Sequence, residues 1–454
     1  MVRITHARAQ YRKVVAMNIV RLIIGCGLLA GGSLLASDQI PAPAQSGVIA
    51  LTGATVYPVS SAPIPNGTIV FVDGKITAIG TDVTVPAGAQ VVDVTGKRIY
   101  PGIINAYTSI GLTEIGAVRA TRDSRETGSI NPNVRAEVSV NPGSEIIPVT
   151  RASGIAVVLS VPAGGTISGR SAVLMLDGWT WEDMVLEAPV ALHLNWPRMR
   201  IVNAWWMDDS EEKQKEDRAE KLKEITDTFD DARAYMKARE ANGGYPTDLR
   251  WEAMIPVLKR EIPVMVAANG IEQIQAAVAW AESEDVRLIL VGGDDAWRVT
   301  ELLKEKGVSV IVAGTHSRPS RRWEDYDLSF RIPALLKDAG IPFCISSGMG
   351  FGGGGAAAHA RSLPHNAGTA AAYGLEVDEA LKAITLYPAQ ILGVADRVGS
   401  LEVGKDATLI VTDGDPLEIL THTERMYIQG RNTDLTSRHT MLYDKYKTKY
   451  LQSQ

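Results

Sequence analysis

Two histidines and a pair of aspartates stand within or directly after apolar runs that read as buried strands. His193 lies in the run "ALHL", Asp294 and Asp295 follow "LILVGG", and His316 follows "VIVAGT". Histidine titrates near neutral pH and a positioned carboxyl group can take or give a proton, so these four residues form a candidate catalytic acid–base set. Each could equally be a satisfied polar group that caps a loop, and the sequence leaves both interpretations open.

Other polar side chains near the ends of predicted strands are candidate contacts to a small-molecule substrate. They are Tyr107, Ser109, Asn269 and Ser347, together with Arg122 in the long polar loop that follows the first strand. An arginine fork binds carboxylates or phosphates. The mixed charges of the loop around Arg122 also fit a solvated lid, which is the interpretation we favour.

These residues need a scaffold that gathers many strand ends at one place. Helical stretches separate apolar runs in the middle of the chain, which favours parallel strands with crossover helices. Eight such strands close a (β/α)8 TIM-like barrel, whose active site lies at the carboxyl ends of the strands. The predicted strands are Ile103–Tyr107, Ile155–Ser160, Ala172–Leu176, Val190–Leu194, Val264–Ala268, Leu288–Val291, Val308–Ala313 and Phe343–Ser346.

The two ends of the chain have a different character from the middle, with short strands joined by turns such as Asp73-Gly74. We therefore predict an α/β protein in which residues 45–100 and 401–454 build one small composite β-sandwich and residues 101–400 form the barrel. The charged stretch Asp208–Glu240 predicts an amphipathic helix. It is either a partner-binding or lid helix or, as we favour, a solvated helix that covers the barrel or its neighbour.

Composition excludes several classes of protein. With 454 residues, 45% hydrophobic and 22% charged, the chain is an ordinary globular one. Its net charge of -6 lacks the basic footprint of nucleic-acid binding, so no nucleic-acid partner is predicted. Two cysteines give neither a disulfide framework nor a cysteine-based zinc site.

The first residues predict a targeting segment. Basic residues precede the uncharged run Leu22–Ala36, and a small-x-small site follows at Ala42-Pro43-Ala44, so residues 1–44 are predicted to be a signal peptide cleaved before Gln45. The mature protein would be periplasmic or extracellular, with no transmembrane span. An uncleaved membrane anchor and a lipoprotein attached through Cys26 are the alternatives.

Three motifs resemble a known superfamily. They are "DGKITAIG", then "VVDVTGKRIYPGIINAY", then "EALKAITLYPAQILGVADRVGSLEVGKDATLIVTDGDP". Together they resemble amidohydrolases of the imidazolonepropionase-like and dihydroorotase-like kind, over roughly residues 48–430. The resemblance implies a metal-bearing (β/α)8 barrel with a composite β-sandwich, and hydrolysis of a non-peptide carbon–nitrogen bond, such as that of a cyclic amide.

The metal site that the resemblance implies is not matched by the residues at its positions. Where ligands or the catalytic aspartate are expected, the chain has Tyr107, Ser109, Ala267, Gly292 and Gly348. Alanine and glycine offer no lone pair to a transition metal. We predict no tightly bound metal or other cofactor there, while a loosely bound divalent cation stays compatible. The chain is then either a hydrolase with a degenerate metal site or a catalytically silent barrel that binds a ligand or protein partner in the envelope. A homo-oligomer is compatible with both.

Overall fold

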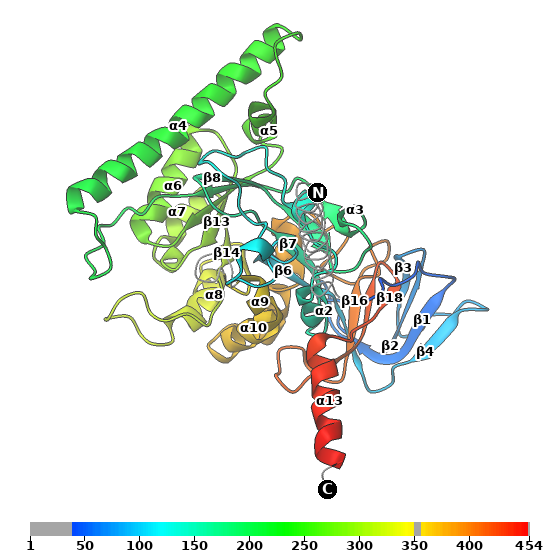
Figure 1. Cartoon of the computed structure of the whole chain (residues 1–454). Helices are drawn as coiled ribbons and strands as arrows, with labels where there is room; N and C mark the ends of the chain where they lie inside the picture. Colours follow the sequence, from blue (N-terminus) through cyan, green and yellow to red (C-terminus); the bar gives the residue numbers. More distant parts are fainter. Residues whose placement is uncertain (1–38, 349–355, 453–454) are drawn as a thin grey trace, which may run out of the picture.

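The computed structural model describes residues 39–348 and 356–452, and its strands form three sheets (Figure 1). The first sheet has eight strands in the order β18-β17-β16-β5-β1-β2-β3, with β4 paired to β1. It joins both ends of the chain, because Tyr100 pairs with Ile410 across antiparallel strands. The strands are β1 (Ile49–Val56), β2 (Ile64–Val72), β3 (Lys75–Gly80), β4 (Gln90–Asp93), β5 (Arg98–Pro101), β16 (Leu409–Thr412), β17 (Thr423–Ile428) and β18 (Arg431–Thr433).

The eight strands predicted for the middle of the chain are all present, in two further sheets. One has the order β10-β9-β7-β6, and the other has the order β15-β14-β13-β12-β11-β8. These two sheets also contain β8 and β10, which were not predicted. The bounds of all their strands are β6 (Ile103–Thr108), β7 (Ile155–Ser160), β8 (Ile167–Arg170), β9 (Ala172–Met175), β10 (Val185–Glu187), β11 (Leu192–Asn195), β12 (Val264–Ala268), β13 (Leu288–Gly292), β14 (Ser309–Val312) and β15 (Phe343–Ile345).

Parallel strands with crossover helices form one half of this unit. The strands from β11 to β15 pair parallel with one another. Three α-helices lie between β12 and β15 in the sequence: α6 (Ile271–Ser283), α7 (Thr300–Glu305) and α8 (Leu328–Asp338). Because each helix returns the chain to the same edge of the sheet, the carboxyl ends of these strands lie together.

The expectation of eight parallel strands in one ring needs a correction. β9 pairs antiparallel with β7, and β8 pairs antiparallel with β11. The physical reason is the short connection 161–166 between β7 and β8. A parallel crossover needs a dozen or more residues, so the chain has to turn back directly. β8 and β9 are separated by Ser171 alone, and each joins a different sheet.

The two sheets also meet on the opposite side, through a short bridge. The Ile104 amide of β6 donates to the Ile384 carbonyl at 2.8 Å, and the Ile345 amide of β15 donates to the Ala383 carbonyl at 2.9 Å. Residues 383–384 lie between α11 (Val377–Lys382) and α12 (Leu386–Ile391). Their carbonyl groups accept the hydrogen bonds of the Ile104 and Ile345 amides, since β6 and β15 do not pair with each other at these positions.

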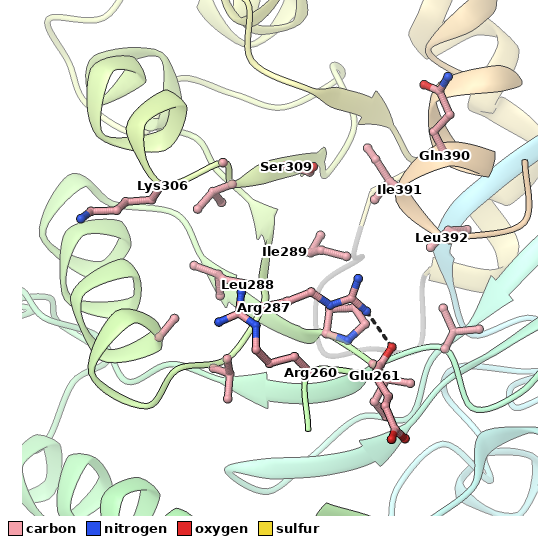
Figure 2. Close-up of a pocket in the computed structure, with 18 of the residues that line it drawn as sticks. Arg260, Glu261, Arg287, Leu288, Ile289, Lys306, Ser309, Gln390, Ile391 and Leu392 are labelled. Atoms are coloured by element: carbon pink, nitrogen blue, oxygen red, sulfur yellow. Dashed lines mark hydrogen bonds between the residues drawn. The ribbon is translucent and has the colours of Figure 1, made fainter. Parts of the chain in front are cut away.

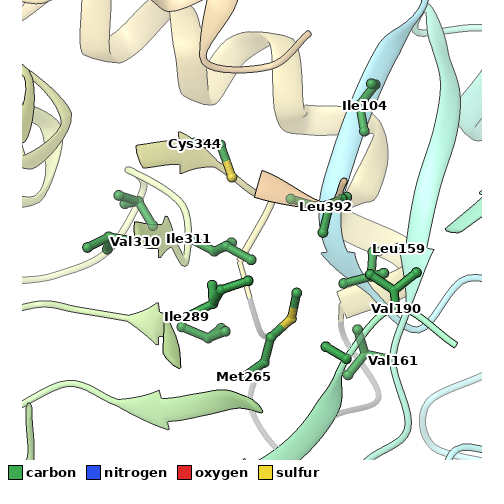
Figure 3. Close-up of a cluster of buried hydrophobic side chains, with 14 of the residues drawn as sticks. Ile104, Leu159, Val161, Val190, Met265, Ile289, Val310, Ile311, Cys344 and Leu392 are labelled. Carbon is green, nitrogen blue, oxygen red and sulfur yellow. The ribbon is translucent and has the colours of Figure 1, made fainter. Parts of the chain in front are cut away.

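An apolar cluster fills the space between the strands (Figure 3). Ile104, Leu159, Met265, Ile289 and Cys344 come from five different strands and are all buried in it. Burial raises the pKa of the Cys344 thiol, which keeps it protonated and unreactive at neutral pH. The centre of the unit is therefore a dry core, and any chemistry belongs at its rim.

The predicted charged helix is α4 (Glu211–Ala241), whose N-cap is Ser210. Its buried face includes Phe229, whose ring meets the edge of Trp280 on α6 at 5.0 Å. α4 therefore packs on the outside of the helices that cover the parallel strands. This agrees with the favoured interpretation of a covering helix. The remaining helices are α2 (Ile146–Arg151), α3 (Trp181–Met184), α5 (Leu249–Leu258), α9 (Ala356–His359), α10 (Leu363–Ala372) and α13 (Arg438–Gln452). Within residues 39–348 and 356–452, no helix has both the length and the apolarity to cross a bilayer.

Glu379 on α11 anchors the bridge and gives a test of this arrangement. Burial alone would raise its pKa, but hydrogen bonds from Lys337, Tyr387 and Lys382 outweigh burial and lower the pKa to about 2. A lowered carboxyl pKa stabilises the fold above the ordinary value of 4.5, and this contribution is lost as the pH falls towards about 2.

We expect Glu379→Gln to lower the free energy of unfolding at pH 7 by about 1–2 kcal/mol, since the two lysines are partly exposed to solvent. The difference from wild type should shrink as the pH falls from about 4.5 to about 2. Urea unfolding at several pH values measures it. Glu376→Gln, at an exposed carboxylate beside α11, is the control and should change stability little. Equal effects of both substitutions would contradict this role for Glu379.

Candidate functional site

Side chains of β6, β11 and the segment after β15 meet at the carboxyl ends of the strands. The side-chain amide of Asn105, on β6, donates to the Ser347 hydroxyl at 2.8 Å. Two residues further along β6, the Tyr107 ring meets the edge of the His193 imidazole of β11, with 5.9 Å between the ring centres. These contacts bring together three of the predicted site residues: Tyr107, His193 and Ser347.

The environment of His193 keeps it neutral. Its side chain is only 4% exposed, and among the described residues Nε2 has no hydrogen-bond partner. Burial lowers the pKa of His193 to about 3 and raises the pKa of Tyr107 to about 12. Neither group changes charge near neutral pH. His193 can therefore accept or donate one hydrogen bond through Nε2, but it cannot serve as a charged acid at pH 7.

The two predicted aspartates have different surroundings. Asp295 is buried, binds the Arg321 guanidinium through both carboxylate oxygens, and caps α6 by accepting from the Ile271 amide at 2.9 Å. Asp294 points to the rim, where the Ser320 hydroxyl donates to it at 3.4 Å. Partial burial and the neighbouring Asp295 charge raise the pKa of Asp294. Asp295 thus has a structural role, and Asp294 remains a proton donor candidate.

His316 lies on the rim after β14, within a cluster that includes helix α10. Its Nε2 atom is 2.7 Å from the Thr369 hydroxyl, and its amide donates to the Asn366 side chain at 3.4 Å. Burial, together with the charge of nearby His316, lowers the pKa of His365. An exposed imidazole with a hydroxyl within hydrogen-bond distance and a second imidazole nearby is an arrangement that can carry out general acid–base chemistry.

The other predicted contacts are placed less centrally. Arg122 is exposed and donates to the Gly116 carbonyl of its own loop at 3.3 Å. Asn269 follows β12, and its amide donates to the Gln273 side chain at 3.0 Å. Ser109 is buried directly after β6. The glycine-rich run 351–355, a weak phosphate-loop signal in the sequence, lies outside the described residues.

The rim cluster contains two residues that were not among the predicted site residues. His365 and Thr369 stand four residues apart on α10, which places both side chains on one face of the helix. This spacing was the available signal. Their approach to His316, about fifty residues earlier in the chain, depends on how α10 packs against β14 and β15, which spacing cannot give.

The residues at the usual amidohydrolase metal position do not fit a transition metal. Tyr107 is protonated, and Ala267 has no donor atom. A Cβ atom at Gly292 would lie 2.2 Å from Asn269 Oδ1, so the space for a side chain there is already filled. Among the described residues, no group of three or more histidines, cysteines or acidic residues is arranged to hold a metal.

A cavity of about 690 Å³ opens at the other end of the strands (Figure 2). Pro263, Leu288 and Ser309, which precede or begin β12, β13 and β14, lie in its wall, with Arg260 and Arg287 near its centre. None of the predicted site residues lines it. It is therefore separate from the rim at which barrel enzymes carry their catalytic groups.

Comparison with known proteins identifies the family of the chain. The family model "Amidohydrolase family" matches residues 197–441, more than half of the chain. A solved amidohydrolase from Thermotoga maritima MSB8 has a TM-score of 0.75 and 28% identity, covering 85% of this chain and 99% of that one. The chain belongs to the amidohydrolase family.

Two curated relatives match over limited parts of their length. Amidohydrolase tasK of Hapsidospora irregularis is 23% identical over 393 residues, which are 81% of this chain and 39% of that protein. An imidazolonepropionase of Syntrophobacter fumaroxidans is 37% identical over 88 residues, 19% of this chain and 20% of that protein. The chain thus spans well under half the length of both relatives.

Replacing the buried histidine tests its protonation state. Because the folded protein binds a proton at His193 only near pH 3, whereas the unfolded chain binds it near 6.5, wild type should lose stability as the pH falls below 6.5. In His193→Phe this loss should be smaller, by about 1.4 kcal/mol per pH unit at most.

Urea unfolding at pH 7, 5.5 and 4.5, compared between the two proteins, measures the difference. His439→Gln, at an exposed histidine, is the matched control and should follow wild type. If His193→Phe also follows wild type, His193 is not held neutral by burial.

Proposed function

We propose that this chain is an exported hydrolase that cleaves a non-peptide carbon–nitrogen bond of a small-molecule substrate, such as a cyclic amide. Family membership supports this reaction class. The observation that carries the proposal is the rim cluster of His316, His365 and Thr369. Its two imidazoles are the titratable side chains that are best placed to contact a substrate. The bridge at 383–384 and the passage of the chain from one sheet to the other at Ser171 support a closed barrel beneath it.

The rim groups can divide the steps of amide hydrolysis among themselves. Neutral His316 takes a proton from a water molecule, whose oxygen bonds to the amide carbon. The Thr369 hydroxyl, 2.7 Å from Nε2, fixes the orientation of the ring. The carbon–nitrogen bond then breaks, and the proton passes to the leaving nitrogen from His316 or from Asp294, whose raised pKa makes it a better donor.

No step in this proposal passes through a metal at the family's usual position, because the residues there do not fit one. His193 and Tyr107 instead form an uncharged wall, and His193 Nε2 could accept or donate one hydrogen bond to a bound substrate. The buried, neutral state of this pair favours the second candidate function, a silent barrel that binds a ligand or partner, and activity measurements separate the two.

We expect His316→Ala to lower kcat/KM by about 10²- to 10⁴-fold, the usual range for loss of a general acid–base group. Chelators should leave wild-type activity unchanged, and dialysed protein should carry much less than one equivalent of transition metal. A panel of cyclic amides, N-acyl amino acids and dipeptides supplies the substrates. His439→Ala is the control.

Full activity in His316→Ala would remove this histidine from the mechanism. Activity that chelators abolish and added zinc restores would place the chemistry on a metal. A folded wild-type protein with no turnover of any substrate would favour the silent barrel.

Export is proposed from the sequence, and two contacts near the start of the described chain favour a processing site earlier than the one before Gln45. The Ala42 amide donates to the buried Asp177 carboxylate at 3.4 Å, and the Gln39 side chain donates to the Thr436 carbonyl. Cleavage before Gln45 would remove both contacts and leave Asp177 with Arg151 and Arg431 alone.

We therefore expect the mature chain of the envelope fraction to begin at or before Gln39. Intact-mass measurement of the purified protein checks this directly. A mature terminus at Gln45 would show that the docked residues are dispensable. A lipid adduct on Cys26 would identify the anchored lipoprotein instead.

A further inference from the structure

The C-terminal helix α13 is fully exposed along its described length. It extends away from the rest of the molecule (Figure 1), and none of its residues is buried. Its base is fixed, since Ser437 is buried and exchanges hydrogen bonds with Thr440 in the first turn. A helix of fifteen residues with no packed face gains little from its own backbone in water, so a face of it is available to something else.

One face of α13 is apolar and aromatic. Leu442, Tyr446 and Tyr450 follow one another at intervals of four residues, and Tyr443 lies beside them. Tyr443 is 65% exposed and Tyr450 is 68% exposed, so this face is in contact with solvent. Contiguous exposed apolar surface of this kind marks a binding surface. We call these four residues the aromatic stripe.

Cationic side chains flank the aromatic stripe on both sides. Lys447 lies 5.6 Å from the Tyr443 ring, and Lys445 lies 5.9 Å from the Tyr446 ring. With Arg438 and Lys449, the helix carries four cations and one carboxylate, Asp444. The whole chain has a net charge of -6, so α13 is a local positive surface on an acidic protein.

This arrangement selects among the partners that could cover the stripe. A second copy of α13 would place lysine rows against lysine rows along both seams, which disfavours self-pairing. An anionic bilayer can cover the aromatic face and also pair with the flanking cations. Tyrosines prefer the boundary between headgroups and acyl chains, while lysines reach outward to the phosphates. We propose that α13 is an interfacial helix that binds the surface of an anionic phospholipid membrane, a property beyond the hydrolase activity.

The start of the described chain lies beside the base of α13. The Gln39 side chain donates to the carbonyl of Thr436, two residues before α13 begins, so the base of the helix is attached to the fold at this contact.

Hydrogen exchange of the full chain, followed in peptides covering residues 438–452, tests the proposal locally. Vesicles of phosphatidylcholine with phosphatidylglycerol should slow exchange in this segment at least about tenfold. Pure phosphatidylcholine vesicles should have much less effect, and raising the salt from about 0.1 M to about 1 M should remove most of the protection. The double variant Tyr446→Ser/Tyr450→Ser should lose it, whereas Tyr326→Ser, at an exposed tyrosine elsewhere, should keep it.

Three results would overturn the proposal. They are absence of protection with anionic vesicles, equal protection by vesicles with and without phosphatidylglycerol, and protection without vesicles that rises with protein concentration. The last would assign the stripe to a second copy of the chain. Activity of the double variant on a substrate of the wild type should be unchanged, so failure of this proposal is distinguishable from failure of the hydrolase assignment.

Discussion

Two backbone hydrogen bonds, from Ile104 and Ile345 to the bridge at 383–384, hold the sheet that contains β6 against the sheet that contains β15. A strand edge inside a protein cannot leave its amides unpaired without a cost comparable to a lost hydrogen bond. Since β6 and β15 do not pair in register here, the chain supplies the carbonyls from the turn between α11 and α12. The contact between Asn105 and Ser347 at the rim depends on this spacing.

The cost of burying charge explains which polar residues stay available for chemistry. Asp295 is buried and therefore needs compensation, which it finds in the Arg321 guanidinium and the amide at the start of α6. Its neighbour Asp294 has a single weak hydroxyl partner and a raised pKa. Two adjacent carboxylates thus take different roles because one turn points the first to the rim and the second into the protein.

The strands were predictable because each is a short apolar run with clear boundaries, and burial on both faces demands such runs. Their directions were only partly predictable. Helical segments between β12 and β15 imply parallel pairing, but the reversal at β8 and β9 follows from the length of a loop that the apolar pattern does not mark. Had the connection 161–166 been weighed against the length of a crossover, the antiparallel strand could have been inferred.

For the site, the positions of polar residues at strand ends could be predicted from the sequence, but the surroundings of each side chain could not. His193 and His316 look alike in the sequence, each following an apolar run, yet one faces Tyr107 in the dry interior and the other faces Thr369 at the surface. Tyr107 lies about 86 positions before His193, and Thr369 lies 53 positions after His316. Tertiary packing brings each of these residues to its histidine. The spacing of residues within one segment does not predict contacts between segments that are far apart in the chain.

The separation of a neutral interior from a titratable rim has a consequence for how the chain could respond to pH. Burial keeps His193 uncharged and Cys344 protonated, so the interior keeps one charge state over the neutral range. His365 and Asp294 lie instead at the rim, where water can solvate their charged forms. In His365 the charge of the neighbouring imidazole adds to burial in lowering the pKa. Protonation of one rim histidine therefore opposes protonation of the other, which favours one neutral imidazole as a base beside any charged one.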